Sequence, residues 1–280
     1  MRSIDTETKL YGIFGNPVKH SISPKIHNHI FNKLNYNARY LAFQPNNLSD
    51  AIKGVRELGI SGLSVTIPFK VEIINYLDEL DELAMYIQAV NTVINENGIL
   101  KGYNTDGIGA LESILDAGVD LNDKNVVILG NGGSTKAIVH TLLAKTSLKN
   151  IFVTGRNEHN VNNFIHSIDS NKLIPVLFSS QKYKEVILES SLIINTTSVG
   201  MVPNINQSLV PPEWINSNHA VFDIVYNPHD TKLICDAKSQ QAKVIYGISM
   251  LINQAYEQAK LFTKMKINKA WLAESVQKIK

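Results

Sequence analysis

The chain has very little cysteine and almost no excess of charge of either sign. Its single cysteine, Cys235, cannot form a disulfide within the chain, which favours a reducing compartment. A formal net charge of +2 gives no electrostatic reason to expect a nucleic acid or an anionic membrane surface as partner. No apolar run is long enough to span a bilayer, and Met1–Asp5 lacks the apolar core of a signal peptide. We therefore expect a soluble cytoplasmic protein without a nucleic-acid or membrane partner.

The chain does have enough apolar residues for a large core. Its 280 residues are 44% hydrophobic and 19% charged, an ordinary globular balance that suits one long domain or two of moderate size. Predicted strands alternate with predicted helices, which is typical of an α/β fold with a mainly parallel sheet. The predicted strands are Lys9–Phe14, Tyr40–Gln44, Gly62–Thr66, Val93–Glu96, Ile99–Tyr103, Asn125–Leu129, Asn150–Thr154, Leu192–Asn195, Ala220–Val225 and Lys243–Tyr246. The predicted helices are Pro24–Leu34, Leu48–Leu58, Lys70–Asn75, Gly107–Ala117, Thr135–Ala144 and Lys232–Ser239, with a further element at Leu80–Tyr86.

Short local signals divide this pattern. Asn97-Gly98 is a favoured two-residue turn and predicts a hairpin. Gly118-Val119-Asp120 ends the helix Gly107–Ala117, and we place a change of domain near it. The last forty residues have the apolar spacing of helices, and we expect them to pack back on an existing domain. Within the helix Lys232–Ser239, we expect Cys235 to be a small apolar filler.

The segment Gly62–Lys70 carries the first candidate for chemistry. It alternates apolar and polar residues like a half-buried strand, stops at Pro68 and places Lys70 just beyond. A lysine can donate or accept a proton if its surroundings move its pKa from about 10.4 toward neutral. A single lysine is more often simply solvated. Here, however, Ala89–Thr92 and Gly102–Gly107 also place short polar side chains at the ends of apolar runs.

A glycine-rich turn follows the apolar strand Asn125–Leu129 and opens a helix. Gly130 allows a tight turn, and Gly132 would let the backbone approach a pyrophosphate resting on the helix N-terminus. Thr135 stands where the pattern has its third glycine, so the motif is imperfect. Its position between a strand and a helix favours a dinucleotide site, and the alternative is an ordinary turn without a ligand.

The tip of the next strand indicates which dinucleotide this would be. A site selective for NAD would place an acidic residue there to hold the ribose hydroxyls. The sequence is instead Thr154-Gly155-Arg156-Asn157, and a guanidinium suits a 2′-phosphate both in charge and in its fork of donors. We therefore expect NADP.

The loop Gly15–Pro24 leads into a predicted helix and contains two serines. Ser23 is expected at the N-cap with Pro24 at the first helical position, which would explain Ser23 without any ligand. Ser21 has no such role. Asp106 also has a capping alternative, because it precedes the helix Gly107–Ala117.

A series of motifs that spans nearly the whole chain, in order, resembles the shikimate dehydrogenase family. The motifs are His20–Pro24, Val65–Lys70, Ala89–Thr92, Asn104–Asp106, Asn195–Met201, Asp223–Pro228 and Gly247–Ala255. The resemblance implies reversible reduction of 3-dehydroshikimate to shikimate with NADPH, in the pathway to aromatic amino acids. It also implies two α/β domains: a substrate-binding domain of residues 1–108 plus 249–280, and a Rossmann-type, doubly wound NADP-binding domain of residues 109–248. The C-terminal helices would return to the first domain.

The resemblance also implies roles for particular residues. Lys70 would be the proton donor in reduction and the base in oxidation, with Asp106 orienting it. Ser21 and Ser23 would hold the substrate carboxylate together with Tyr226. The other substrate-binding residues would be Thr66, Lys70, Asn91, Asp106 and Gln254. The cofactor-binding residues would be Gly130, Asn131, Gly132, Gly133, Ser134, Gly155, Arg156, Asn157, Ile224, Gly247 and Met250. No metal is expected, and the protein would be a monomer or a homodimer.

The chain departs from the family pattern around the cofactor, and two alternatives stay open. Asn131 stands where the family usually has alanine, and Asn160 where it often has a second basic residue, so the preference for NADP can be weaker than in relatives. An NAD-using quinate/shikimate dehydrogenase would share most of the motifs. A non-catalytic homologue that binds shikimate is disfavoured because both Lys70 and Asp106 are present. A methyltransferase has only the glycine turn in its favour.

Overall fold

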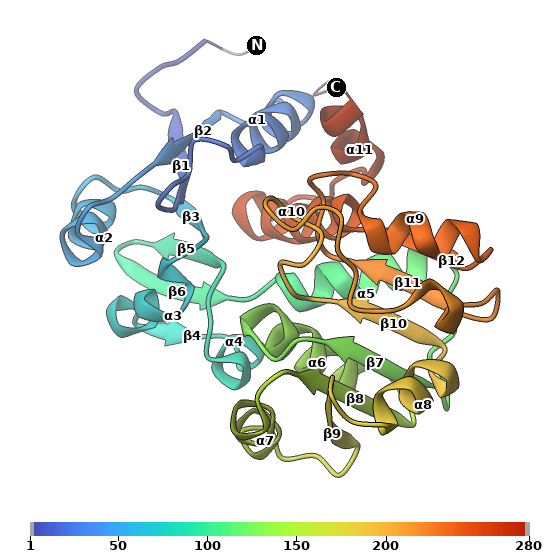
Figure 1. Ribbon diagram of the computed structural model, residues 1–280. Helices are drawn as coiled ribbons and strands as arrows, with labels where there is room; N and C mark the ends of the chain where they lie inside the picture. Colours follow the sequence, from blue (N-terminus) through green and yellow to red (C-terminus); the bar gives the residue numbers. More distant parts are fainter. Residues whose placement is uncertain (1–2, 278–280) are drawn as a thin grey trace. The chain divides into compact units, whose positions relative to one another are not determined.

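The computed structural model describes residues 3–277 and divides into two compact units (Figure 1). Unit 1 comprises Met1–Ile108 and Ile252–Lys280, and unit 2 comprises Gly109–Leu251. The first division coincides with the expected boundary between residues 108 and 109. The second falls three residues beyond the expected one, inside the helix α10 (Gly247–Thr263).

Unit 1 is built on a six-stranded mixed sheet with the strand order β2-β1-β3-β5-β6-β4. The strands are β1 (Lys9–Phe14), β2 (Ala38–Phe43), β3 (Gly62–Val65), β4 (Glu79–Leu80), β5 (Thr92–Glu96) and β6 (Ile99–Tyr103). β1, β2 and β3 are parallel, whereas β5 is antiparallel to both of its neighbours. Asn97 and Gly98 both have positive φ, at 55° and 89°, as a tight hairpin turn requires. The predicted hairpin is thus confirmed.

The helices of unit 1 come from both ends of the chain. The N-terminal part contributes α1 (Ser23–Lys33), α2 (Leu48–Glu57), α3 (Phe69–Glu72), the 3₁₀ helix η1 (Ile73–Tyr76) and α4 (Glu82–Ile87). The C-terminal part contributes most of α10 and α11 (Ala270–Gln277). Ile26 and Ile30 of α1 pack with Ala255 and Ala259 of α10 and with Leu272 of α11. The C-terminal helices therefore pack on an existing domain, as their apolar spacing predicts.

Unit 2 is a doubly wound Rossmann-type fold. Its six strands are all parallel, in the order β12-β11-β10-β7-β8-β9, which is the strand arrangement of dinucleotide-binding domains. The strands are β7 (Asn125–Leu129), β8 (Asn150–Gly155), β9 (Leu173–Leu177), β10 (Leu192–Asn195), β11 (Ala220–Asp223) and β12 (Lys243–Tyr246). The helices are most of α5 (Asp106–Asp116), α6 (Gly133–Lys145), α7 (Glu158–His166), α8 (Lys182–Glu189) and α9 (Lys232–Ser239), with a 3₁₀ turn η2 (Pro212–Trp214).

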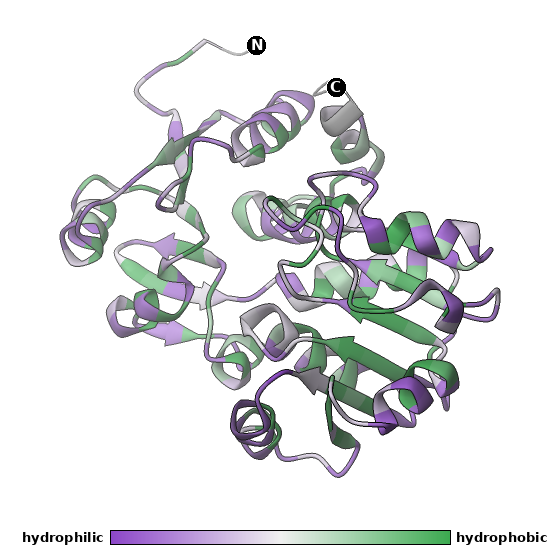
Figure 2. Cartoon of the chain, in the orientation of Figure 1, coloured by the Kyte–Doolittle hydropathy of each residue, from purple (hydrophilic) through white to green (hydrophobic). Residues whose placement is uncertain are grey.

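Both faces of this sheet are buried. Val126 and Ile128 of β7 belong to one apolar cluster, and the intervening Val127 and Leu129 belong to another. Alternate residues of a strand face opposite sides of the sheet, so helices must cover both sides. Figure 2 shows this as nearly continuous hydrophobic colouring along the strands, while the helices carry both colours.

Some local predictions were wrong or missing. Cys235 is exposed on α9 and is not the buried filler that its apolar character suggested. The segment Leu80–Tyr86 divides into the end of β4 and most of α4. α7, β9 and α8 were not predicted.

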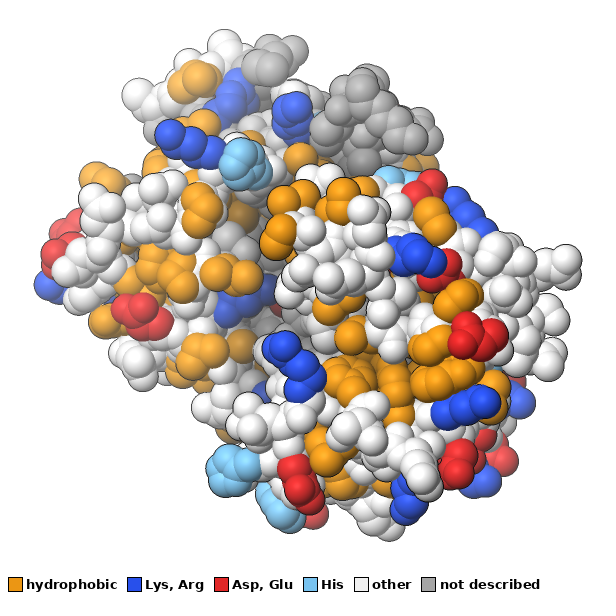
Figure 3. Space-filling model, viewed as in Figure 1, with side chains coloured by type: hydrophobic (Ala, Val, Ile, Leu, Met, Phe, Trp, Pro, Cys, Tyr) orange, Lys and Arg blue, Asp and Glu red, His pale blue; other side chains and the backbone are white. Residues whose placement is uncertain are grey.

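No helix among residues 3–277 is both long and apolar enough to cross a bilayer. On the face shown in Figure 3, Lys and Arg side chains are scattered rather than gathered into one patch.

Candidate active site

Lys70 lies on a short helix just after β3. The strand ends at Val65, Thr66 to Pro68 form a turn, and Lys70 is the second residue of α3. Its Nζ donates a hydrogen bond to Oδ2 of Asp106 at 2.6 Å. The Lys70 side chain is 29% exposed and that of Asp106 is 14% exposed, so the pair is largely shielded but still reached by solvent.

Asp106 begins α5, but its carboxylate does not cap that helix. Oδ2 is engaged by Lys70, and Oδ1 accepts a hydrogen bond from Nδ2 of the buried Asn91 at 2.7 Å. The Asp106 backbone N–H donates to Oδ1 of Asn104 at 3.0 Å, so Asn104 serves the helix start instead. The capping alternative for Asp106 is therefore wrong. Through its two carboxylate oxygens, Asp106 links the segments that carry Lys70 and Asn91 to the start of α5.

Thr105 connects this pair to the C-terminal helix. Its Oγ1 accepts a hydrogen bond from Nδ2 of Asn91 at 3.0 Å and donates to Oε1 of Gln254 on α10 at 3.5 Å. The structure thus brings Lys70, Asn91, Asp106 and Gln254 into one network. Thr105 was not among the predicted site residues, although it stands inside the Asn104–Asp106 motif that pointed to the site.

Ser21 and Ser23 stand at the start of α1, but Ser23 does not have the capping role expected of it. Ser23 is the first residue of α1 and not its N-cap, because Ile22 occupies that position with helical φ and ψ. Oγ of Ser21 instead accepts a hydrogen bond from the Ser23 N–H at 3.3 Å, so it is Ser21 that supports the helix start. The predicted cap at Ser23 is therefore wrong.

Thr66 lies beside the same loop. Its N–H donates to the Phe14 carbonyl, and a Cβ on Gly15 would lie only 2.4 Å from its Cγ2, so the loop passes close to Thr66 because residue 15 is glycine. Among residues 3–277, no hydrogen bond links Ser21, Ser23 or Thr66 to Lys70 or Asp106.

The glycine turn of unit 2 leaves the start of α6 open. Gly130 has φ of +115°, and a Cβ there would lie 2.8 Å from Oγ1 of Thr196, so only glycine suits the position. A Cβ at Gly132 or Gly133 would have no protein atom within 4 Å. The exposed N-terminus of a helix with free space before it suits a pyrophosphate, so these residues fit a dinucleotide. Ser134 follows in the first turn of α6.

Thr135, which replaces the third glycine of the pattern, is completely buried. Its Oγ1 accepts a hydrogen bond from the Gly132 N–H at 3.2 Å and lies 2.8 Å from Oγ1 of Thr196. Thr196 in turn donates to the Leu129 carbonyl at 2.8 Å. The threonine is accommodated by hydrogen bonds that a glycine could not make, and the imperfect motif keeps its turn.

Three further cofactor candidates gather at the tip of β8. A Cβ on Gly155 would lie 2.5 Å from Cγ2 of Val161 and 3.6 Å from Oδ1 of Asn131, so the glycine turn passes beside the strand's end. Arg156 is exposed. Asn157 is the N-cap of α7, where its side chain accepts a hydrogen bond from the Asn160 N–H at 3.0 Å. This structural role of Asn157 was not predicted from the sequence.

The remaining candidates lie where β11 and β12 end. A Cβ on Gly247 would meet the Ile224 carbonyl oxygen at 2.4 Å, so glycine is required for α10 to begin there. The side chain of Met250 packs in the apolar cluster that also contains Phe222, with 9% exposure. Tyr226, just after β11, is 48% exposed.

Asp223 is a buried carboxylate at the end of β11 that had no predicted role by itself. It accepts hydrogen bonds from Nδ2 of Asn195 at 2.9 Å, from Oγ1 of Thr231 at 2.6 Å and from the Val225 N–H at 3.0 Å. Burial raises the pKa of this carboxyl, and the three donors oppose that shift. The side chain ties together the ends of β10 and β11, which carry two of the family motifs.

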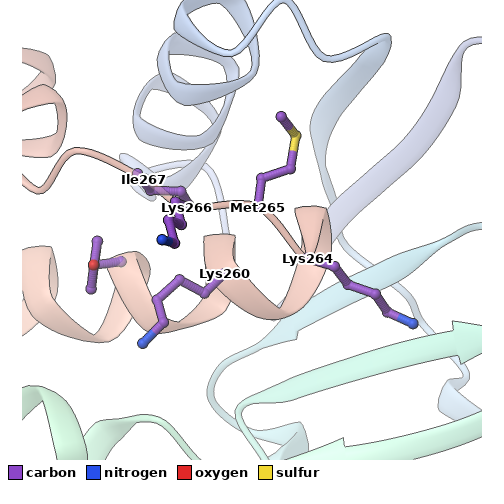
Figure 4. Close-up of a pocket in the computed structure, with 6 residues that line it drawn as sticks. Lys260, Lys264, Met265, Lys266 and Ile267 are labelled. Atoms are coloured by element: carbon purple, nitrogen blue, oxygen red, sulfur yellow. The ribbon is translucent and has the colours of Figure 1, made fainter.

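The cavity drawn in Figure 4 has a lining that contains none of these residues. It has a volume of about 500 Å³ and is lined by Tyr256, Lys260, Lys264, Met265, Lys266 and Ile267, none of which is a predicted site residue. The ammonium groups of Lys260 and Lys264 are paired with Glu257 and Glu96. Within residues 3–277, no group of three or more His, Cys, Asp or Glu side chains is placed to hold a metal ion.

Comparisons with known proteins identify relatives along almost the whole chain. Residues 13–93 match the model of the shikimate dehydrogenase substrate binding domain, and residues 111–232 match that of shikimate / quinate 5-dehydrogenase. The shikimate dehydrogenase (NADP(+)) of Caldanaerobacter subterraneus subsp. tengcongensis is 40% identical over 276 residues, 98% of each chain. That of Methanosphaera stadtmanae is 41% identical and covers 93% of each chain.

A solved structure agrees with these relatives. Shikimate 5-dehydrogenase from Listeria monocytogenes, in complex with shikimate and NAD, superimposes with a TM-score of 0.92 at 31% identity, covering 99% of each chain. The Rossmann-type fold of two α/β units predicted from the sequence is confirmed.

Proposed function

Because the chain belongs to the shikimate dehydrogenase family, we propose that it catalyses the reversible reduction of 3-dehydroshikimate to shikimate with NADPH, in the biosynthesis of aromatic amino acids. The observation that carries this proposal is the hydrogen-bonded set of Lys70, Asp106 and Asn91 in unit 1. A set of this kind supplies a proton donor at a defined place, which the reduction of a ketone needs.

The chemistry of the chain's own residues follows from that set. Bound NADPH supplies the hydride. Lys70 donates the proton from Nζ to the developing alkoxide, and the resulting amine stays hydrogen-bonded to Asp106. The Asp106 carboxylate accepts a hydrogen bond from Nζ at 2.6 Å and so holds this nitrogen in one direction. In the oxidation of shikimate, the same nitrogen accepts the proton.

The polar groups near this pair suit a small acid with several hydroxyls, which is held by convergent hydrogen bonds rather than by an apolar slot. We assign the carboxylate to Ser21, Ser23 and Tyr226, and the hydroxyls and carbonyl to Thr66, Lys70, Asn91, Asp106 and Gln254. In this structure protein partners already engage the amide of Asn91: Nδ2 contacts Asp106 and Thr105, and Oδ1 accepts from Thr105 and Thr92. A substrate hydroxyl would have to replace or share one of these contacts.

We assign NADP binding to unit 2 and most of the substrate binding to unit 1. The glycine turn would hold the pyrophosphate through Gly130 to Ser134, and Arg156 would contact the 2′-phosphate together with Gly155, Asn157 and Asn131. Ile224, Gly247 and Met250 would border the nicotinamide end. A cytoplasmic location and a monomeric or homodimeric state stay predictions.

A side-by-side assay tests the function. Absorbance of NADPH is followed with 3-dehydroshikimate, and oxidation of shikimate and of quinate is followed with NADP and with NAD. We expect consumption of NADPH and a higher kcat/KM with shikimate and NADP than with the other three pairs. A flat absorbance together with binding of shikimate would indicate the non-catalytic homologue. Faster oxidation of quinate with NAD would indicate a quinate/shikimate dehydrogenase.

A further inference from the structure

Gln258 is a buried amide in the middle of the helix α10. It is 2% exposed and lies one turn after Gln254. Nε2 donates hydrogen bonds to the Asn91 carbonyl at 3.1 Å and to Oγ1 of Thr92 at 3.0 Å. Oε1 lies 2.8 Å from Oγ of Ser64 and 3.3 Å from Nε2 of His27. The amide thus uses both of its donors and both acceptor positions, and it joins α10 to α1, β3 and β5.

The orientation of this amide follows from its partners. A backbone carbonyl can only accept, so the group that faces the Asn91 carbonyl must be the NH₂ of Gln258. Oε1 then faces Ser64 and His27. Burial lowers the pKa of His27 to about 4, so its ring is neutral at pH 7. Because Oε1 of Gln258 can only accept, Nε2 of His27 carries the proton and donates to it, and Nδ1 has no hydrogen-bond partner among the described residues.

The donor and acceptor of each hydrogen bond can be identified along the path from Gln258 to Asp106. Thr92 accepts from Gln258, and its hydroxyl proton is then free to donate to Oδ1 of Asn91 at 2.7 Å. Oδ1 of Asn91 is identified as an acceptor independently, because the Thr105 N–H donates to it at 2.9 Å. Nδ2 of Asn91 must therefore face Oδ1 of Asp106 at 2.7 Å, which leaves Oδ2 for Lys70.

We propose that Gln258 is a positioning residue for the Lys70–Asp106 pair, acting through Thr92 and Asn91. Gln258 does not contact either member of the pair. It determines which way the Thr92 hydroxyl points, and this hydroxyl, together with the Thr105 N–H, holds the Asn91 amide that contacts the Asp106 carboxylate. Catalytic groups are effective only when the residues behind them fix their geometry. The proposal rests on the function proposed above, since it takes Lys70 as the proton donor.

Two pairs of variants test the proposal on the full-length enzyme. Thr92→Val removes the hydroxyl at almost constant volume, whereas Thr92→Ser keeps it. Gln258→Met removes all four hydrogen bonds of the amide, whereas Ser64→Ala removes one partner of Oε1 and leaves the path to Asp106 intact. kcat and KM for shikimate and for NADP are measured, and rates are expressed per NADPH-binding site so that misfolded protein is not counted.

Gln258→Met and Thr92→Val should each lower kcat/KM for shikimate roughly 10- to 100-fold, mostly through kcat, as expected for a displaced catalytic group. KM for NADP should stay about the same. Thr92→Ser and Ser64→Ala should keep most of the parent rate. The double variant Gln258→Met with Thr92→Val should be no slower than the slower single variant, because both changes break one path.

Parent-like rates in Gln258→Met, equal losses in Thr92→Ser and Thr92→Val, or multiplied losses in the double variant would overturn the proposal. If Gln258→Met fails to fold, the comparison of Thr92→Val with Thr92→Ser still tests the proposal. The parent enzyme separates this question from the function itself. A parent without activity would refute the proposed function, whereas an active parent with unaffected variants would refute only the positioning role.

Discussion

At the scale of single residues, what a polar side chain does here depends on which partners reach it. Asp106 could have capped α5, yet both of its oxygens are engaged by Asn91 and Lys70. Ser21, which had no local role in the sequence, accepts a hydrogen bond from Ser23.

Lys70→Ala is expected to lower kcat by about 10²–10⁴-fold, the usual cost of losing a general acid–base group, with a smaller change in KM for shikimate. Steady-state kinetics measure both. Lys53→Ala is a suitable control, because Lys53 is an exposed lysine of the same unit, paired with Asp50 on α2. A Lys70→Ala enzyme with near-parent kcat would exclude Lys70 as the donor.

Arg156→Ala is expected to raise KM for NADP by about ten- to a hundredfold, the value of a charge-assisted contact to phosphate, while KM for NAD barely changes. Arg156 is an exposed cation at the tip of β8. Lys182→Ala removes an exposed cation from α8 in the same unit and should change neither constant. An unchanged ratio of the two KM values in Arg156→Ala would mean that other groups recognise the phosphate.

Acidification should destabilise the protein through His27. The ring is completely buried, and burial lowers its pKa from 6.5 to about 4. Between these two values the unfolded chain binds a proton that the folded protein does not, so stability falls as pH decreases from 6.5 toward 4. At pH 5 this group should cost about 2 kcal/mol relative to pH 7.5.

Urea unfolding of the parent and of His27→Gln at both pH values isolates this loss. The variant should lose less stability on acidification than the parent, even if it is less stable at pH 7.5. His166→Gln, which changes an exposed histidine on α7, is the control. Equal losses in the parent and in His27→Gln would contradict the account.

At the scale of elements, the ends of helices and strands carry most of the candidate site. Lys70 and Asp106 stand in the first turns of α3 and α5, and the cofactor candidates follow β7, β8 and β11. This is expected for open α/β sheets, in which ligands bind at the carboxyl ends of the strands. Residues at such ends often combine two roles, one structural and one in binding.

Two substitutions of Asn157 can distinguish its structural role from its proposed role in binding. Asn157→Ala should lower the free energy of unfolding by about 1 kcal/mol, because α7 loses its N-cap. Asn157→Asp keeps the cap, but it places a carboxylate next to Arg156 and should raise KM for NADP relative to that for NAD. Urea unfolding and kinetics with both cofactors measure these effects.

Asn47→Ala is the matched control for the cap. Asn47 caps α2 in unit 1 through the Asp50 N–H at 3.1 Å. Its loss should cost similar stability without any change in cofactor preference. If Asn157→Asp keeps the parent's preference for NADP, residue 157 lies outside the region that recognises the phosphate.

At the scale of the whole molecule, the two units differ in how the chain builds them. Unit 2 is one continuous stretch, and the apolar clusters on both faces of its sheet are formed by residues between Ala110 and Met250. Unit 1 is completed only when the chain returns through α10, because Ile26 and Ile30 are buried against Ala255 and Ala259. Unit 2 alone therefore contains a complete core.

A fragment of residues Gly109–Leu251 should accordingly fold by itself and bind NADPH without binding shikimate. Circular dichroism and a cooperative urea transition report folding, and NADPH fluorescence reports binding. The same fragment with Gly130→Val is the control, because φ of +115° and the nearby Thr196 exclude a β-branched residue at that position. A fragment without a cooperative transition would show that unit 2 depends on the rest of the chain.

Features that depend on neighbouring residues could be predicted from the sequence alone. Most strands were predicted within one or two residues, Asn97-Gly98 predicted its hairpin, and the glycine turn was located before α6. These features follow from apolar periodicity and from the allowed φ angles of a few residues. The motif order, from His20–Pro24 to Gly247–Ala255, was sufficient to identify the family.

Partnerships between residues far apart in the chain emerge only when the chain is folded. Gln258 and Asn91 are separated by 167 residues, and nothing local to either predicts their hydrogen bond. The sequence likewise did not predict the exposure of Cys235 or the antiparallel pairing of β5 with β3. Local propensity depends on a few adjacent residues, whereas burial and hydrogen-bond partners depend on how distant segments pack. The sequence therefore pointed to Lys70 and Asp106, and the fold supplied the residues that orient them.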